Sequence, residues 1–485
     1  MDALKQKTLN SLFWRFLERG GSQMVSLLVQ VVLARILAPE QFGIIAIVLV
    51  FINIATVFVQ NGFNTALIQN RTISNEDYST VFWISLGIAS VLYALIFAGA
   101  PIASEFYNMP DLDIVLRVLS VTLFFGAYNS IQVAYVMREL EYKKLFKGTI
   151  AAVLISGALA ILLALCGAGI WALVAQQLSC SFVSCAALST MVPWKPKLVF
   201  SLQRAKILFS FGWKLLLSSL IDTGYSSLYD LVIGKAFSAN DLAYYSQGKK
   251  YPDAITKLID GSIQSVTLST MSKLQDDYRG ARNLMRRAIQ TSTFVLTPLL
   301  ACACILAQQI IVLILGEKWL LAVPFFQMAC LSAMFRPVHT TNLQTMNALG
   351  RSDLFLKLEI IKKTLGCILF VAALILTNNV YVVAMTSVIS SIICTFVNAA
   401  PNRKLLGYSY KAQFKDIAPA FGLSLLVSLV SYGILQITSF GPLLDLLAIG
   451  GFTLLLYGFL GYVFKLESFE YTLKVITDAR SKFSQ

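Results

Sequence analysis

The chain has 485 residues, of which 57% are hydrophobic and 13% are charged, and its formal net charge at pH 7 is +14. Soluble globular proteins are about 45–50% apolar and about 25% charged. This composition, with a mean hydropathy of +0.72, therefore excludes a soluble enzyme and indicates a protein that crosses a membrane many times. A positive net charge is typical of a membrane protein with lysines and arginines on its cytoplasmic side, and we expect no nucleic-acid partner.

Hydropathy predicts an all-α fold with about fourteen transmembrane helices of about 20 mainly apolar residues each. In chain order, the predicted spans are 11–37, 42–69, 79–103, 112–136, 147–166, 169–191, 207–236, 241–269, 287–315, 323–348, 355–377, 380–400, 417–437 and 441–464. If the N-terminus is cytoplasmic, the connections on the opposite side carry only Lys235 and Lys318, and the other lysines and arginines outside the spans are cytoplasmic. This asymmetry predicts that both termini are cytoplasmic.

The connections on the extracytoplasmic side are short, as at 167–169 and 377–379. They leave no room for an external catalytic domain, so we expect a protein that is not an enzyme and that acts between its helices. The chain has one histidine, His339, and its eight cysteines lie in apolar runs. We therefore expect no metal site, no disulfide framework and no cofactor, and we expect His339 to be a packing residue.

The beginning of the chain is repeated near its middle. Residues 11–15 (SLFWR) correspond to 210–214 (SFGWK), and the turn at 33–42 corresponds to the turn at 233–242. In both copies a cation closes the first helix, where it complements the helix dipole, and an acid begins the next. Tryptophans at a membrane interface would not by themselves produce this shared spacing. Six predicted spans separate the copies, which predicts parallel repeats with a substrate site between them.

The repeat predicts two six-helix lobes related by a parallel pseudo-twofold axis, with two helices added at the C-terminal end. The expected parts are an N-lobe at 1–192, a cytoplasmic amphipathic linker at 193–206, a C-lobe at 207–400, and spans 13 and 14 with a cytoplasmic tail at 401–485. Segments 193–206 and 271–286 are basic and amphipathic, which predicts helices that lie on the anionic inner leaflet.

Polar residues inside the first, second, seventh and eighth spans follow steps of three and four, which place them on one helical face. A charge at mid-bilayer costs at least about 2.5–3.5 kcal/mol, so such residues indicate function. The cationic members are Arg15, Arg19, Lys214, Lys249, Lys250 and Lys257. The uncharged members are Ser22, Ser26, Gln30, Asn53, Thr56, Gln60, Asn64, Ser218, Ser226 and Gln264. The acidic members are Glu18, Asp222, Asp230, Asp253 and Asp260.

These four stripes predict one hydrophilic cavity between the halves of the molecule. Its cationic balance suits an anionic substrate, and phosphate is the natural candidate. The alternative is that the charges pair and merely hold helices together, because Lys249 with Asp253 and Asp253 with Lys257 have the spacing for same-helix pairs. Against this, the array contains more ionisable groups than helix association requires.

The residues at the first two spans also resemble a known family. Trp14-Arg15 near Gly20-Gly21, followed by LARILAPEQFG at 33–43, is similar to the polysaccharide-transporter family of bacterial oligosaccharide flippases, such as the colanic acid, succinoglycan and teichuronic acid exporters. Their superfamily also contains the lipid II flippases and the multidrug and toxin extruders. The resemblance implies twelve core helices in two lobes, with spans 13 and 14 appended.

The resemblance further implies an activity. It implies that undecaprenyl-pyrophosphate-linked oligosaccharide repeat units move from the inner to the outer leaflet of the bacterial cytoplasmic membrane by alternating access, for lipopolysaccharide, capsule or exopolysaccharide biosynthesis. Lipid II flippases carry essential arginines on their first helix, and Arg15 and Arg19 lie in the comparable stretch. Their eighth helix adds a cation, for which Lys249 and Lys250 are the nearest match, although lysine does not reproduce the bidentate contact of arginine.

On this interpretation the cations bind the pyrophosphate, the uncharged residues contact sugars, and the carboxylates couple transport to H⁺ or Na⁺. The expected partners are the polyprenyl-pyrophosphate-linked glycan, membrane lipids and other polysaccharide-assembly proteins. Two alternatives stay open. A multidrug-type antiporter coupled to cations would need an acidic, aromatic-rich cavity, and a membrane polymerase or ligase of the same pathway would need a large external loop.

Overall fold

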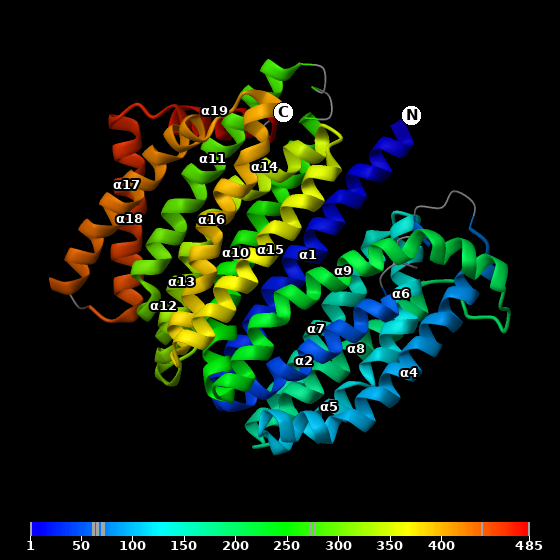
Figure 1. Ribbon diagram of the computed structural model, residues 1–485. Helices are drawn as coiled ribbons and strands as arrows, with labels where there is room; N and C mark the ends of the chain where they lie inside the picture. Colours follow the sequence, from blue (N-terminus) through cyan, green and yellow to red (C-terminus); the bar gives the residue numbers. More distant parts are fainter. Residues whose placement is uncertain are drawn as a thin grey trace. The chain divides into compact units, whose positions relative to one another are not determined.

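All the regular secondary structure in the described part of the chain is helical (Figure 1). The computed structural model describes residues 2–60, 64, 67–68, 73–271, 274, 277–437 and 440–483. The chain divides into two compact units, Met1–Ala243 and Tyr244–Gln485. The all-α membrane fold expected from hydropathy is confirmed, whereas the bounds expected for the lobes and the linker stay predictions.

In the first unit α1, α7 and α8 pack together, and α9 packs on α2 and α4. Its helices are α1 (Asp2–Ile36), α2 (Pro39–Gln60), α4 (Asn75–Tyr107), α5 (Pro110–Leu119), α6 (Thr122–Arg138), α7 (Tyr142–Leu165), α8 (Ile170–Met191) and α9 (Leu202–Ala236). α1 packs along α7, α7 packs along α8, and α9 packs along α2 and α4. The close approach of α1 and α7 depends on Gly157, because a Cβ there would lie 2.5 Å from Val29 Cγ2.

The second unit begins within α10 (Ala239–Met271). Its further helices are α11 (Tyr278–Ile305), α12 (Ala307–Ile314), the 3₁₀ helix η2 (Glu317–Ala322), α13 (Val323–Ala333), α14 (Arg336–Ala348), α15 (Ser352–Leu376), α16 (Val380–Leu406), α17 (Tyr410–Ile437), α18 (Pro442–Val463) and α19 (Glu467–Phe483). α11 packs against α13, α14 and α17, and α17 packs against α18. Met285, Ile289, Val338 and Tyr408 are fully buried where these helices meet.

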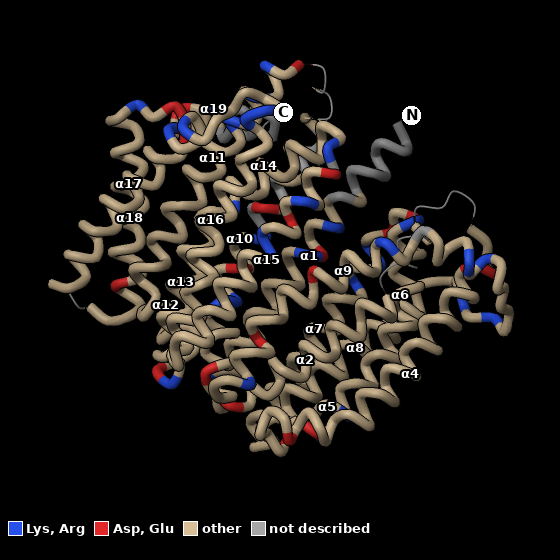
Figure 2. The backbone as a smooth tube through the Cα atoms, viewed as in Figure 1, with Lys and Arg blue, Asp and Glu red and all other residues tan. Residues whose placement is uncertain are grey.

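Ten helical stretches in the described residues are long and apolar enough to cross a membrane. α1, α9, α10 and α15 are not among them, because charged residues interrupt their apolar windows. Lys, Arg, Asp and Glu are sparse along α17 and α18, whereas α10 carries them in its middle turns (Figure 2). The count of fourteen spans therefore stays a prediction.

Three spans that were expected to be continuous are broken in the structure. The span at 112–136 divides into α5 and α6, the one at 287–315 into α11 and α12, and the one at 323–348 into α13 and α14. At the first break, Ser120 Oγ donates to Arg117 O at 2.7 Å and Thr122 Oγ1 donates to Leu119 O at 2.6 Å. Hydroxyl groups of this kind satisfy carbonyls that lose their helical partner, and hydropathy does not register such a break.

The helix expected over 193–206 is wrong for most of its length. Residues 192–201 are not helical, and α9 begins at Leu202. Pro193 and Pro196 explain this, because proline lacks a backbone N–H and disfavours a helical residue before it. Of the second expected surface helix, 271–286, the structure assigns Met271 to the end of α10 and residues from Tyr278 onward to α11, and residues 272–273 and 275–276 lie outside the described part.

The local structure of the internal repeat agrees with its sequence. α1 and α9 both have 35 residues, they end at Ile36 and Ala236, and the next helices begin at Pro39 and Ala239. The acid at the start of the second helix of the second copy forms a capping box, because Ser238 N donates to Asp241 Oδ2 at 3.2 Å and Asp241 N donates to Ser238 Oγ at 3.1 Å. The two copies thus share helix length, turn and restart.

Candidate functional site

The predicted site residues fall in two groups, one in each unit. The first group lies on α1, α2 and α9, with Asn64 just beyond α2, and the second lies on α10. That the two groups converge on one chamber stays a prediction. Within each unit the contacts of these residues are defined.

Arg15, on α1, is held against the start of α7. Its Nη1 donates to Tyr142 Oη at 3.0 Å, and its guanidinium lies 5.2 Å from the centre of the Tyr142 ring. The Arg15 side chain is half-buried, whereas Arg19, one turn further along, is exposed. The two arginines of the stripe are therefore in different states: one is anchored by an aromatic partner and one presents its charge outward.

The uncharged residues of α1 use their polar atoms within the first unit. Ser22 is buried, and its hydroxyl donates to the backbone carbonyl of Glu18. Gln30 Nε2 donates to Gln176 Oε1 of α8 at 3.0 Å. Ser26 is half-buried. Ser22 and Gln30 thus contribute to helix conformation and helix packing, in addition to any role toward a substrate.

On α2, the polar stripe becomes less exposed toward the C-terminal end. Asn53 is exposed, and Thr56 and Gln60 are half-buried. The Gln60 amide lies against α6, where a Cβ on Gly126 would be 2.9 Å from Gln60 Nε2. Asn64 is half-buried in a short described stretch.

On α9, the stripe runs along an exposed face. Lys214, Ser218, Asp222 and Ser226 are exposed at steps of four, and Asp230 is half-buried. Ser226 Oγ donates to Thr223 O at 2.9 Å, within its own helix. Leu217 and Ile221 are also exposed beside this stripe, while other residues of α9 pack on α2 and α4.

On α10, two of the predicted carboxylates share one arginine from α14. Arg336 Nη2 lies 3.7 Å from Asp253 Oδ1, and Arg336 Nη1 lies 3.7 Å from Asp260 Oδ2. Asp260 is buried and also accepts from Thr340 Oγ1 at 3.1 Å. Sequence reasoning gave Arg336 no role, although an arginine in a predicted span is itself a signal of a buried acidic partner.

The cations of α10 lie near these carboxylates along the helix. Lys249 Nζ lies 5.6 Å from the centre of the Tyr245 ring, and Lys250 is half-buried. Lys257 and Gln264 are exposed. α10 therefore combines an acidic face directed at α14 with cations that are at least partly accessible.

His339, one turn after Arg336, contacts α16 through one of its ring nitrogens. Its Nε2 lies 3.0 Å from Ser391 O and 2.8 Å from Thr395 Oγ1, both on α16. These contacts confirm the expectation that His339 is a packing residue of the helix interface.

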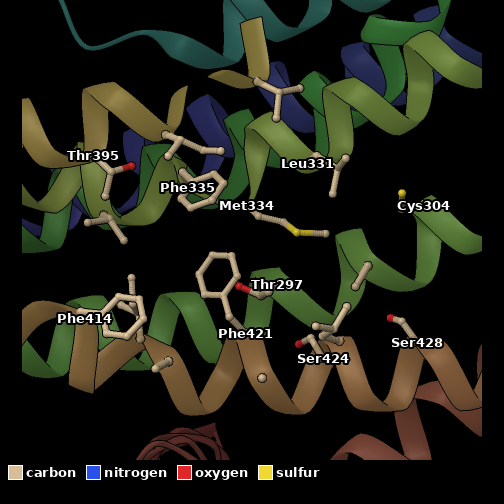
Figure 3. A pocket seen from close by; sticks show the side chains of 18 of the residues that line it. Thr297, Cys304, Leu331, Met334, Phe335, Thr395, Phe414, Phe421, Ser424 and Ser428 are labelled. Atoms are coloured by element: carbon tan, nitrogen blue, oxygen red, sulfur yellow. The ribbon is translucent and has the colours of Figure 1, made fainter. Parts of the chain in front are cut away.

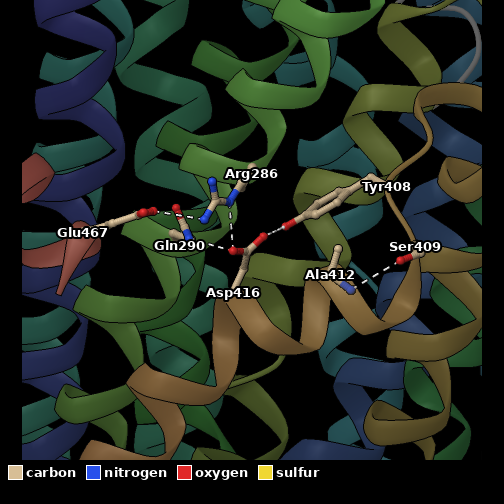
Figure 4. A network of polar contacts seen from close by, with 7 residues as sticks. All are labelled: Arg286, Gln290, Tyr408, Ser409, Ala412, Asp416 and Glu467. Carbon is tan, nitrogen blue, oxygen red and sulfur yellow. Dashed lines mark hydrogen bonds and ion pairs between the residues drawn. The ribbon is translucent and has the colours of Figure 1, made fainter.

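A second charged network joins α11, α17 and α19, and the sequence gave no indication of it (Figure 4). Arg286 Nε donates to Asp416 Oδ1 at 2.8 Å, and Arg286 Nη2 lies 3.0 Å from Glu467 Oε2. The other Asp416 oxygen accepts from Tyr408 Oη at 2.6 Å, and Gln290 Nε2 donates to Asp416 Oδ1 at 2.9 Å. Asp416 is buried and fully hydrogen-bonded, so this network fixes the appended helix α17 to the rest of the second unit.

An apolar cavity of about 850 Å³ lies in the second unit, between α11, α13, α14, α16 and α17 (Figure 3). Phe335 and Phe421 stack across it with ring centres 5.2 Å apart. Its polar contributions are few and consist mostly of hydroxyl groups, such as those of Thr297, Ser424 and Ser428. Such a space suits an aliphatic or isoprenoid chain.

Comparison with known families identifies the class of protein. The model of a polysaccharide biosynthesis protein family matches residues 32–324, and the chain belongs to this family. Its fold is similar to those of a lipid II flippase and of a multidrug resistance transporter.

Relatives of known role are distant in sequence. The chain is 24% identical to the lipopolysaccharide biosynthesis protein WzxC of Escherichia coli over 89% of this chain and 88% of the relative. It is 24% identical to the succinoglycan biosynthesis transport protein ExoT of Rhizobium meliloti over 66% of this chain and 65% of the relative. It is 25% identical to the teichuronic acid biosynthesis protein TuaB of Bacillus subtilis over 78% of this chain and 79% of the relative.

Solved structures confirm the fold. The lipid II flippase MurJ in an inward closed conformation aligns with a TM-score of 0.73 and 14% identity, over 94% of this chain and 98% of that chain. An inward-facing multidrug resistance transporter of the MATE family aligns with a TM-score of 0.62 and 17% identity, over 79% and 94% of the two chains.

Proposed function

We propose that this protein is a flippase that moves undecaprenyl-pyrophosphate-linked oligosaccharide repeat units from the inner to the outer leaflet of a bacterial cytoplasmic membrane. The observation that carries the proposal is the presence of cations on the polar faces of α1, α9 and α10 in a member of a polysaccharide biosynthesis family. An anionic head group and a polar glycan cannot cross hydrocarbon unaided, because burying unpaired polar and charged groups is costly. A wet, cationic path removes most of that cost.

In this proposal the residue roles follow from charge and exposure. Arg19, Lys214 and Lys257 are exposed cations that meet the pyrophosphate, together with Arg15, Lys249 and Lys250. Hydroxyls and amides on the same faces, such as Ser218 and Asn53, contact sugars. The apolar cavity of the second unit is suited to the isoprenoid chain, which needs no polar partner.

The arrangement of Arg336 with Asp253 and Asp260 supports a proposal for the driving force. Protonation of either carboxylate would weaken its contact with Arg336 and free α14 to shift relative to α10. We therefore place H⁺ coupling on these two carboxylates rather than on Glu18, Asp222 or Asp230. Na⁺ coupling at the same carboxylates is the second possibility, and replacing Na⁺ by choline at constant pH separates the two.

The proposal includes the cellular setting. Both termini are cytoplasmic, the cargo arrives from membrane glycosyltransferases, and the exported units pass to other assembly proteins. The protein itself forms and breaks no bond in the glycan.

Deletion of the gene in its native host tests the proposal. The expected result is loss of the surface glycan together with accumulation of lipid-linked repeat units on the inner leaflet, both restored by the wild-type gene. A polymerase or ligase would instead leave single units on the outer leaflet, and a multidrug antiporter would leave the glycan intact and reduce dye efflux. Either of these two results would contradict the proposal.

A further inference from the structure

A basic cavity lies at one end of the first unit, where the start of α7 meets α1 and the end of α8. It has a volume of about 500 Å³. The described residues that line it are Ser11, Trp14, Leu140, Glu141, Lys143, Lys144, Lys147 and Met191. Three of these are lysines and one is an acid, so the cavity is cationic.

The three lysines of this cavity occupy positions that are electrostatically unfavourable for a cation. All three lie in the first two turns of α7, beside the positive end of the helix dipole, and the first turn of α7 contains no acid. Lys143 and Lys147 are also one turn apart on the same face, where like charges repel. Glu141 lies 2.6 Å from Lys144, which leaves the charges of Lys143 and Lys147 uncompensated by the acid of the cavity. A bound anion would relieve all of these unfavourable contacts.

The backbone at the edge of the cavity is strained. Leu140 has a φ of 58°, in the left-handed region that side chains other than glycine rarely adopt. Ser11 of α1 holds this conformation, because its hydroxyl donates to Leu140 O at 2.6 Å. Strained residues that are fixed by their surroundings occur preferentially at functional sites.

An aromatic wall completes the cavity. The Trp14 ring packs against Phe146 with ring centres 5.5 Å apart, and Lys143 Nζ lies 5.3 Å from the centre of the Trp14 ring. Tryptophan with lysine is the pair of residue types that membrane proteins place at the level of lipid head groups.

The exposed face of α7 indicates that the anion carries acyl chains. Lys143 and Lys147 lie on the same exposed face as Leu154 and Leu162, which follow at helical spacing and are 53% and 62% exposed. Other sides of α7 pack on α1 and α8, where Gly157 approaches Val29 and Gly148 approaches Leu188. Chains of a lipid whose head group occupies the cavity would therefore run along an apolar surface of the same helix.

We propose that this cavity binds the phosphate head group of an anionic phospholipid of the leaflet that it faces. Lys143 and Lys147 neutralise the phosphate, Trp14 closes the side toward α1, and the apolar face of α7 receives the acyl chains. None of the described lining residues of this cavity is among those proposed to contact the glycan.

Lipid binding to the purified protein in detergent tests this proposal, with phosphatidylglycerol as the probe and native mass spectrometry as the readout. The double variant Lys143→Gln/Lys147→Gln should weaken the tightest binding about thirtyfold, since each lysine near an anionic lipid contributes roughly a fivefold effect. Lys143→Arg/Lys147→Arg should retain it. The matched control is Lys411→Gln/Lys415→Gln, which removes two exposed lysines of the same spacing at the start of α17, and it should bind like the wild type.

Equal binding by the glutamine variant and the wild type would overturn the proposal. Release of the lipid by inorganic phosphate at equal concentration would overturn it too, because the site would then recognise a free anion. Tighter binding of a short-chain polyprenyl pyrophosphate than of phosphatidylglycerol would assign the cavity to the cargo instead. The measurement uses neither glycan nor ion gradient, so its outcome is independent of whether the flippase proposal holds.

Discussion

Arg336 shows what a single intramembrane charge contributes in this fold. It reaches two carboxylates of α10 from the first turn of α14, and one of them, Asp260, has a side chain that is only 7% exposed. An acid in that position is tolerated because a cation and the Thr340 hydroxyl face it. The same arginine thus stabilises the packing of α10 on α14 and makes this packing sensitive to protonation.

Replacing Arg336 by Gln should destabilise the protein, because Asp260 loses its cation and keeps only the Thr340 hydrogen bond. We expect the free energy of unfolding to fall by about 1–3 kcal/mol, measured as a lower midpoint of thermal unfolding in detergent. Arg351→Gln is the control, since Arg351 pairs with the exposed Asp353 and should leave the midpoint unchanged. Equal midpoints for the two variants would show that the Arg336 contacts do not hold α10.

In the Asp416 network, too, one arginine contacts two acids, Asp416 and Glu467, and these differ in burial. Asp416 is buried with three hydrogen-bonding partners, whereas the side chain of Glu467 is 72% exposed. Asp416→Ala should therefore cost on the order of 3 kcal/mol, and Glu467→Ala less than about 1 kcal/mol. Thermal unfolding in detergent measures both, and a larger loss from Glu467→Ala would contradict the assignment of Asp416 as the centre of the network.

Which residues carry charge inside the spans was readable from the sequence, but their partners were not. Helical spacing placed Asp253 and Asp260 on one face of a helix, and the structure agrees with this placement. Their partner Arg336 lies far along the chain, and no periodicity connects it to them. Asp416 was missed because it lies just before the predicted span 417–437, and because its partners are Arg286 and Gln290 of α11 and Tyr408 before α17.

At the scale of elements, helix type and order follow from hydropathy, whereas helix breaks follow from local chemistry. A window of apolar residues does not distinguish one helix from two that are joined by a tight turn, as at Ser120 between α5 and α6. The linker before α9 could have been recognised from Pro193 and Pro196. The attachment of this linker to α4 could not be recognised from the sequence. It depends on hydrogen bonds that Lys197 N and Ser201 N donate to the hydroxyls of Ser79 and Thr80, at 3.2 Å each.

The contact of α2 with the start of α10 provides a test at this scale. A Cβ on Gly43 would lie 1.9 Å from Ala239 O, whereas a Cβ on Gly87 of α4 would meet nothing within 4 Å. Gly43→Ala should therefore cost about 1–3 kcal/mol by overpacking, and Gly87→Ala should stabilise its helix by about 0.5–1 kcal/mol. Shifts of opposite sign in thermal unfolding are expected, and an unchanged midpoint for Gly43→Ala would show that this close approach is not required.

At the scale of the whole molecule, the repeat and the family explain why polar stripes recur on the first two helices of each copy. α1 and α9 have equal length, and the turn that separates each of them from the following helix has the same number of residues. In this repeat Arg15 corresponds to Lys214, whereas Lys249, Lys250 and Lys257 correspond to apolar residues of α2. Duplication therefore explains the cation near the start of α1 and α9, and the lysines of α10 belong to the second copy alone. Sequence alone was sufficient for this pattern, and for the fold class that the comparisons confirm, because both depend on periodicity rather than on contacts.

The central claim is that cations of these helices carry the anionic head group of a lipid-linked glycan across the bilayer. The most direct test is translocation in proteoliposomes, with lipid-linked repeat units from the native host and a membrane-impermeant oxidant that reports the leaflet they occupy. The account predicts that Arg15→Gln/Arg19→Gln lowers the rate at least about tenfold, while Lys411→Gln/Lys415→Gln retains it. Translocation by the arginine variant at the wild-type rate would contradict the account.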